Sequence, residues 1–414
     1  MIDTTHFTLS NGLRIVHSYN PPSAMVALNV VYDVGSRDET PGLTGMAHLF
    51  EHLMFGGSVN IPSFDAALEL AGGVNNAWTS NDFTSFYDIA PAVNAETLFW
   101  LESDRMLSLA FSERNLDIQR SVVIEEFKQT ALKTPYGDLM HHLRALAYTT
   151  HPYSYPTIGR DIEELRRVTL EDISKFYYSH YGPNNAVLSV TGDITAEETL
   201  RLAEKWFSSI PRREIAPRLY PAEPPLNGPV RKTVEANVAQ TALVIAFRMG
   251  GYGAPDYIPA DLITDILSAG RSSRFYRELI MSTDHFTNID ASILGSEEPG
   301  LLLISSRLRE DSDRAIEEAE KAIWSQLNRM ATERVTESEL QRAVNGFDSE
   351  NRFAAINFLN RAEMLAMAVL HDQDINSIIP AYRAVKVDDI LNVSASLFRP
   401  ENSATLVYRP RKTE

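Results

Sequence analysis

Residues 48–52 read HLFEH, and this run constrains the fold of the 414-residue chain more than any other feature. Residues four apart lie on one face of an α-helix, so a helix here places the two imidazoles side by side. Glu51 borders the same face. Gly45 before the run and Gly56 after it favour a helix of this length, because glycine is common where helices begin and end.

Two imidazoles and a carboxylate in the order HxxEH are typical of a hydrolytic zinc site. A bound zinc ion lowers the pKa of its water toward neutrality, and a neighbouring carboxylate can take the proton as the hydroxide attacks a carbonyl. The pattern predicts that His48 and His52 bind one zinc ion per chain and that Glu51 is the general base. The alternative is a surface helix with incidental histidines, but the residues between and around the ligands are mostly apolar.

A catalytic zinc site takes three protein ligands, so a third must come from elsewhere in the chain. Segment 112–133 has helical periodicity, and Glu126 falls within its apolar arc whereas Glu125 falls beyond the edge. A carboxylate directed into a core is costly unless it is paired or binds a metal, so Glu126 is the predicted ligand. A different phase of the helix would leave both carboxylates outside. The arc consists of Leu116, Ile118, Val122, Val123 and Phe127.

These motifs make the chain resemble the pitrilysin-like M16 family of inverted zinc metallopeptidases, which includes insulin-degrading enzyme and the mitochondrial processing peptidases. In that family HxxEH is followed by a third-ligand glutamate, and Glu126 lies at the matching distance. The resemblance covers most of residues 6–210. Its further signatures are residues 72–80, 151–153, 158–160 and 190–193.

The resemblance implies an α+β fold of the LuxS/MPP-like metallohydrolase type. Two homologous α/β-sandwich domains, each an antiparallel-rich sheet flanked by helices, would form an internal repeat. The sequence agrees, because each half ends in a similar apolar strand, at 185–191 and at 403–408. We predict a zinc-binding domain at 1–210, a proline-rich linker at 211–226 and a second domain without HxxEH at 227–414.

The resemblance also implies a short-chain (M16B-type) zinc endopeptidase that binds extended peptides along a sheet edge. Asn76, Ala77 and Thr79 fall in the matching stretch and are the expected substrate-binding residues. The alternative is a subunit without catalysis, which binds peptides or organises an assembly. The intact ligands and the presence of Glu51 favour the enzyme.

The second half departs from the family pattern. Active members contribute an arginine and a tyrosine that bind the substrate carbonyl, but here Ile280 stands where the arginine is expected. Thr287, or Phe286 after a one-residue slip, stands at the tyrosine position. Arg271 and Arg274 lie nearby and are interpreted as helix-surface charges. We therefore expect the zinc-carrying subunit of a heterodimer whose paralogous partner supplies the pair; a self-sufficient homodimer is the alternative.

Gln119 is a second departure, since the family usually has a glutamate there that supports the zinc site. On the predicted helix Gln119 projects beside Glu126, two turns earlier. A neutral amide can hydrogen-bond a ligand histidine, but it cannot increase the basicity of that ligand as a carboxylate does. Weaker zinc retention is expected.

Composition limits the partners. The chain has no cysteine, which leaves histidine and carboxylate as its strong metal ligands. A net charge of −17 argues against nucleic acid, and it either steers cationic peptides or simply confers solubility. No apolar run has the length of a membrane span, and the N-terminus lacks a signal-peptide pattern. A cytoplasmic location is expected, or a periplasmic one if a leader was removed.

Overall fold

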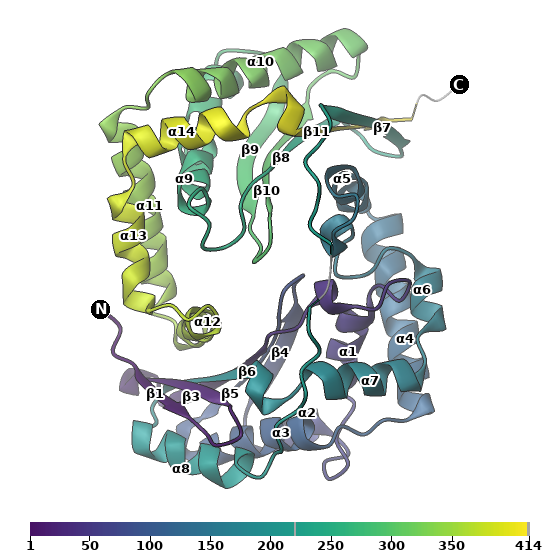
Figure 1. Cartoon of the computed structure of the whole chain (residues 1–414), viewed down its shortest axis with the longest axis vertical. Helices are drawn as coiled ribbons and strands as arrows, with labels where there is room; N and C mark the ends of the chain where they lie inside the picture. Colours follow the sequence, from purple (N-terminus) through teal and green to yellow (C-terminus); the bar gives the residue numbers. More distant parts are fainter. Residues whose placement is uncertain (219–220, 412–414) are drawn as a thin grey trace. The chain divides into compact units, whose positions relative to one another are not determined.

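The chain forms two compact units in its computed structural model, and each is built on one sheet (Figure 1). The structure describes residues 1–218 and 221–411. Among them, unit 1 comprises 1–127, 156–218 and 350–378, and unit 2 comprises 128–155, 221–349 and 379–411. Positions 219–220 of the predicted linker and 412–414 of the predicted second domain lie outside the described residues.

Unit 1 contains a six-stranded sheet in the order β1-β2-β6-β3-β5-β4. β2 and β6 pair in parallel, and the other neighbours pair antiparallel. The central strands read as nearly continuous apolar runs because both of their faces are covered, whereas β4 alternates between exposed and half-buried residues at the edge. The strands are β1 Thr5–Thr8, β2 Arg14–Tyr19, β3 Met25–Tyr32, β4 Val74–Thr79, β5 Thr84–Pro91 and β6 Ala186–Gly192.

Helices cover both faces of this sheet. Successive strand residues point to opposite faces, so Leu188 of β6 belongs to the main core with α1 and α3 while Val187 packs against α12. The candidate metal-binding helix therefore lies in the layer opposite α12. The helices are α1 Met46–Met54, α2 Phe64–Leu70, α3 Ala95–Leu107, α4 Glu113–Phe127, α6 Ile162–Arg167, α7 Leu170–His180, α8 Ala196–Phe207 and α12 Phe358–Leu370.

Unit 2 repeats the topology of unit 1. Its five-stranded sheet has the order β7-β11-β8-β10-β9, and β7 pairs in parallel with β11 as β2 does with β6. The predicted two-domain fold with an internal repeat is thus confirmed. The strands are β7 Val230–Ala236, β8 Ala242–Arg248, β9 Phe286–Leu294, β10 Leu301–Leu308 and β11 Ser403–Pro410. The remaining helices are α5 Leu139–Ala147, α9 Tyr257–Ser268, α10 Asp313–Thr332, α11 Glu337–Ala354, α13 Ile378–Ala384 and α14 Val387–Leu397.

The compact units differ from the predicted sequence halves 1–210 and 227–414 because two helices are exchanged. α5 comes from the first half but packs on β7, β8 and β11. α12 comes from the second half but packs on the equivalent strands β2, β3 and β6. An amphipathic pattern shows which side of a helix is buried but not which sheet covers it, so this exchange could not be predicted from the pattern.

No single helix in the described ranges is long and apolar enough to cross a membrane. The pair α11 and α12 meets that length and composition only when taken together, and it bends by 114° at the break.

Candidate metal centre

The first turn of α1 is fixed by contacts from outside the helix. Gly45 has φ +87°, and a Cβ there would lie 2.7 Å from the carbonyl oxygen of Ile158, so only glycine fits. The Glu39 carboxylate accepts hydrogen bonds from the backbone N–H groups of Gly45 (3.0 Å) and Ala47 (2.9 Å). A negative charge at this end also complements the helix dipole. The segment that carries residues 48–52 is thereby anchored.

The close approach of α4 to α1 depends on Gly56. A Cβ at Gly56 would lie 2.1 Å from Nδ2 of Asn115, in the first turn of α4. The start of α4 therefore lies at the end of α1, and the later turns of α4 run back along it. This antiparallel packing brings Glu126 to the level of the two histidines.

The buried side of α4 is narrower than predicted. Val123 is buried, but Ile118 and Val122 of the predicted apolar arc are exposed by 49% and 45%. Their placement in the core is wrong because α4 packs mainly against α1 and α6, so apolar residues outside that stripe stay at the surface. Glu126 lies half-buried beside the stripe, whereas Glu125 is exposed.

His48, His52 and Glu126 converge. The Nε2 atoms of His48 and His52 lie 3.8 and 3.5 Å from Oε2 of Glu126. One ligand atom from each residue lies within 4.8 Å of the others, and within the described ranges no other group of three or more His, Asp or Glu does so. Ligands about 2.0–2.2 Å from a tetrahedral zinc ion lie about 3.4 Å from one another, so this His₂Glu set fits zinc with small adjustments.

Electrostatics favour the ligand forms of these groups. Burial lowers the pKa of His48 to about 4, against the opposing charge of Glu126, so the imidazole is neutral at physiological pH. A hydrogen bond from His52 lowers the pKa of Glu126 and keeps it ionised. His48 Nδ1 is buried and has no hydrogen-bond partner among the described residues. Gln119 is half-buried, and among the described residues it makes no hydrogen bond to His48 or His52.

Glu51 is held by a residue of the sheet edge. Its side chain is buried, and Oε2 accepts a hydrogen bond of 2.5 Å from Oγ1 of Thr79 on β4. Burial raises the pKa of Glu51, and this hydrogen bond opposes the rise. Sequence reasoning expected Thr79 only at the substrate and missed its bond to Glu51. The 28 residues between them leave no local spacing signal.

β4 presents a free edge beside these groups. Its alternate residues Asn75, Ala77 and Thr79 are half-buried, whereas Asn76 and Trp78 are exposed. The backbone N–H of Ala77 donates to Oδ1 of Asn76 at 2.9 Å. A hollow of about 310 Å³ lies beside the start of the strand, lined by Asp65, Leu68, Glu69, Gly73, Val74 and Asn75. The three predicted substrate-binding residues, Asn76, Ala77 and Thr79, all lie on β4. Thr79 also contacts Glu51.

The structure corrects one interpretation in the second half. Arg274 is not a surface charge: it is buried, and its Nε lies 2.9 Å from Oε1 of Glu339. Arg271 is exposed. Ile280 ends a π-helical turn, Tyr276–Ile280, and Phe286 is fully buried at the start of β9.

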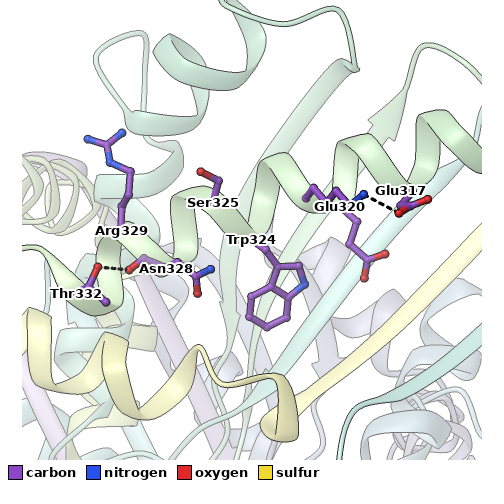
Figure 2. Close-up of a pocket in the computed structure, with 8 residues that line it drawn as sticks. Glu317, Glu320, Trp324, Ser325, Asn328, Arg329 and Thr332 are labelled. Atoms are coloured by element: carbon purple, nitrogen blue, oxygen red, sulfur yellow. Dashed lines mark hydrogen bonds and ion pairs between the residues drawn. The ribbon is translucent and has the colours of Figure 1, made fainter.

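A larger hollow of about 690 Å³ lies along α10 in unit 2 (Figure 2). Trp324 packs against Phe247 there, with ring centroids 5.6 Å apart. The carboxylates of Glu317 and Glu320 form ion pairs with Lys321 and Arg231. Within the described ranges, no group of three His, Asp or Glu residues with converging ligand atoms lies in this lining. The lining consists of Glu317, Glu320, Lys321, Trp324, Ser325, Asn328, Arg329 and Thr332.

Two family models match the chain. "Insulinase (Peptidase family M16)" matches residues 14–161, and "Peptidase M16 inactive domain" matches residues 167–347. The chain belongs to peptidase family M16. The first match contains α1 and α4, and the second contains no HxxEH, as expected for the repeat without a zinc motif.

Individual M16 relatives are similar over most of the chain. Zinc protease PqqE of Helicobacter pylori is 26% identical over 423 residues, 97% of this chain and 92% of that protein. The uncharacterized zinc protease YmxG of Bacillus subtilis is 29% identical over 280 residues, 66% of each. The crystal structure of a protease from Helicobacter pylori superposes with a TM-score of 0.90 at 24% identity, covering 99% of this chain and 100% of that one. This likeness confirms the fold.

Proposed function

We propose that this M16 chain is a zinc-dependent endopeptidase that hydrolyses peptides bound as an extended strand along β4. The observation that carries the proposal is the convergence of Glu126 on α4 with His48 and His52 on α1, where one ligand atom of each lies within 4.8 Å of the others and α1 also bears Glu51. These three residues would hold one zinc ion, which supplies Lewis acidity and an activated water when bound. The names of the relatives, zinc proteases, support the same activity.

The chain's own residues would position the peptide and move the proton. An edge strand can add a peptide strand through backbone hydrogen bonds, and Asn76 and Ala77 lie on that edge. Thr79 connects the edge to Glu51, so a peptide paired with β4 would run past the carboxylate. Glu51 would accept the proton of the attacking water and pass it to the departing amide nitrogen. Its burial favours the protonated form that carries the proton between these two steps.

We further propose that a paralogous M16 subunit supplies the missing arginine and tyrosine. Such a pair stabilises charge on the substrate carbonyl oxygen, a contribution of about 3–4 kcal/mol for one donor in a well-studied case. Ile280 and Phe286 cannot provide it, and Phe286 is buried. A homodimer that works without these groups, or a subunit that binds peptides without cleaving them, would be revealed by the same experiment.

The experiment is hydrolysis of an unstructured quenched-fluorescence peptide by the zinc-loaded chain. Glu51→Gln serves as the blank, and Glu125→Gln, at an exposed position of α4, is the matched control. Turnover on the order of 1–10³ s⁻¹ by the chain alone, lost in the blank, would support the peptidase and contradict the need for a partner. Turnover only after a paralogue is added would support the heterodimer. No turnover under either condition would contradict the enzyme.

A further inference from the structure

One exposed residue of β4, Trp78, lies close to the cluster that α12 forms with the sheet. Because strand residues alternate in direction, Trp78 points to the face opposite Thr79 and Glu51. The Trp78 side chain is 41% exposed, and its ring centroid lies 4.9 Å from that of Phe83. Phe83 packs in the cluster that α12 forms with the sheet. Trp78 therefore stands between the free strand edge and α12.

Glu363 of α12 faces this tryptophan. Glu363 is half-buried, and burial raises the pKa of its carboxyl, whereas the Trp78 indole N–H within its reach opposes the rise. Within the described part of the chain, no lysine, arginine or histidine forms an ion pair with Glu363. A half-buried carboxylate with a single donor is costly unless a cation completes it.

We propose that Trp78 and Glu363 form a subsite beside the β4 edge that binds a lysine or arginine side chain of the peptide. The inference rests on the proposed function, because it assumes that the peptide pairs with β4. On one face of paired strands, Cβ atoms of opposite residues lie about 4.5–5.5 Å apart. A basic side chain opposite Trp78 would thus lie over the indole ring and extend its charge to Glu363.

Other side chains fit this position less well. The face of an indole attracts cations by about 0.5–2 kcal/mol, and the carboxylate adds a charge-assisted hydrogen bond. An apolar side chain would remove Glu363 further from water without replacing its missing partner. An acidic side chain would be repelled. The expected order of preference is basic, then neutral polar, then apolar or acidic.

Binding can be measured without cleavage in the zinc-loaded Glu51→Gln chain. Fluorescence anisotropy would follow a set of labelled unstructured peptides in which one lysine is moved through a sequence of small neutral residues. We expect one position at which lysine or arginine binds about tenfold more tightly than glutamine. Adding Glu363→Gln should abolish this preference, and adding Glu363→Arg should shift it to glutamate. Glu204→Gln, an equal charge change at an exposed position of α8, should preserve it.

Peptide hydrolysis by the chain with Glu51 intact, with any required partner present, separates the proposed peptidase function from the proposed subsite. For the preferred lysine peptide, Glu363→Gln should raise KM about tenfold and leave kcat unchanged, because the subsite binds the ground and transition states alike. The chain could cleave the peptides without preferring a basic residue at any position, or with a preference that Glu363→Gln preserves. Either result would overturn the subsite but not the proposed function. Peptides that are neither bound nor cleaved would overturn the proposed function and the subsite with it.

Discussion

Oγ1 of Thr79 donates a hydrogen bond of 2.5 Å to Oε2 of Glu51, and this bond joins the free edge of the unit 1 sheet to the proposed general base. One carboxylate oxygen is thereby engaged, which leaves the other to receive a proton. The strand that would align the peptide also orients the group that would act on it. Substrate position and proton transfer are coupled through one side chain.

Replacing Thr79 with valine tests this coupling. Valine keeps the branched shape but cannot donate a hydrogen bond, and a bond to a charged group contributes about 1.5–3 kcal/mol. We expect kcat for an unstructured peptide to fall at least about tenfold, with zinc content unchanged. Thr79→Ser keeps the hydroxyl and should retain most of the activity. Full activity in Thr79→Val would show that the bond does not orient the base.

Zinc stoichiometry tests the ligand set directly. Alanine at His48, His52 or Glu126 should lower bound zinc from one ion per chain to near zero after dialysis, as measured by plasma mass spectrometry. Each change removes one of three donors, and a site with two is far weaker. Glu125→Ala, one residue away and exposed, should keep its zinc. Loss of zinc in Glu125→Ala but not in Glu126→Ala would reverse the assignment.

Local patterns predicted the elements that carry the site. Glycines marked the ends of α1, and periodicity distinguished Glu126 from Glu125 although it misplaced Ile118 and Val122. Apolar runs also located the strands at 185–191 and 403–408, because a buried strand has few polar residues. These features depend on residues that are close together in the sequence, and a sequence pattern reports on such residues.

Contacts between distant residues could not be predicted in this way. Arg274 looked like a surface charge because its partner Glu339 lies 65 residues further along the chain. The bond from Thr79 to Glu51 and the packing of α12 on the first sheet have the same origin. Each depends on which elements meet in space, and neither periodicity nor composition specifies that.

Gln119→Glu tests the support of the ligand histidines. His48 Nδ1 is buried without a partner, so the imidazole lacks the second hydrogen bond that metal-bound histidines usually donate. A carboxylate in place of the amide should tighten zinc binding about 10–100-fold, measured by competition with a chromophoric chelator. Ile118→Glu adds the same charge at an exposed position of α4 and should change affinity much less. Equal effects of the two variants would point to net charge alone.

A buried acidic pair lies beneath the edge strand. Asp88 of β5 and Glu102 of α3 are fully buried, and Nε of Arg105 donates to Oε2 of Glu102 at 2.8 Å. Neither oxygen of Asp88 receives a hydrogen bond from the described residues. Burial raises the pKa of Asp88 well above its usual value, and the charge of Glu102 raises it further. Burial and the neighbouring charge of Glu102 thus favour the protonated form of Asp88 in the folded chain.

Asp88→Asn should remove a pH dependence of stability that this proton creates. The folded pKa lies above the unfolded one, so the folded state binds more protons, and the stability of the natural chain falls as pH rises above about 4. The slope is at most about 1.4 kcal/mol per pH unit until the folded pKa is reached. Asparagine has nearly the same shape but cannot ionise. In urea unfolding we expect the two chains to be similar near pH 4 and the variant to become progressively more stable toward pH 8. The free energy of unfolding of Glu204→Gln should depend on pH as that of the natural chain does. The same dependence in Asp88→Asn would mean that Asp88 is ionised in the folded state.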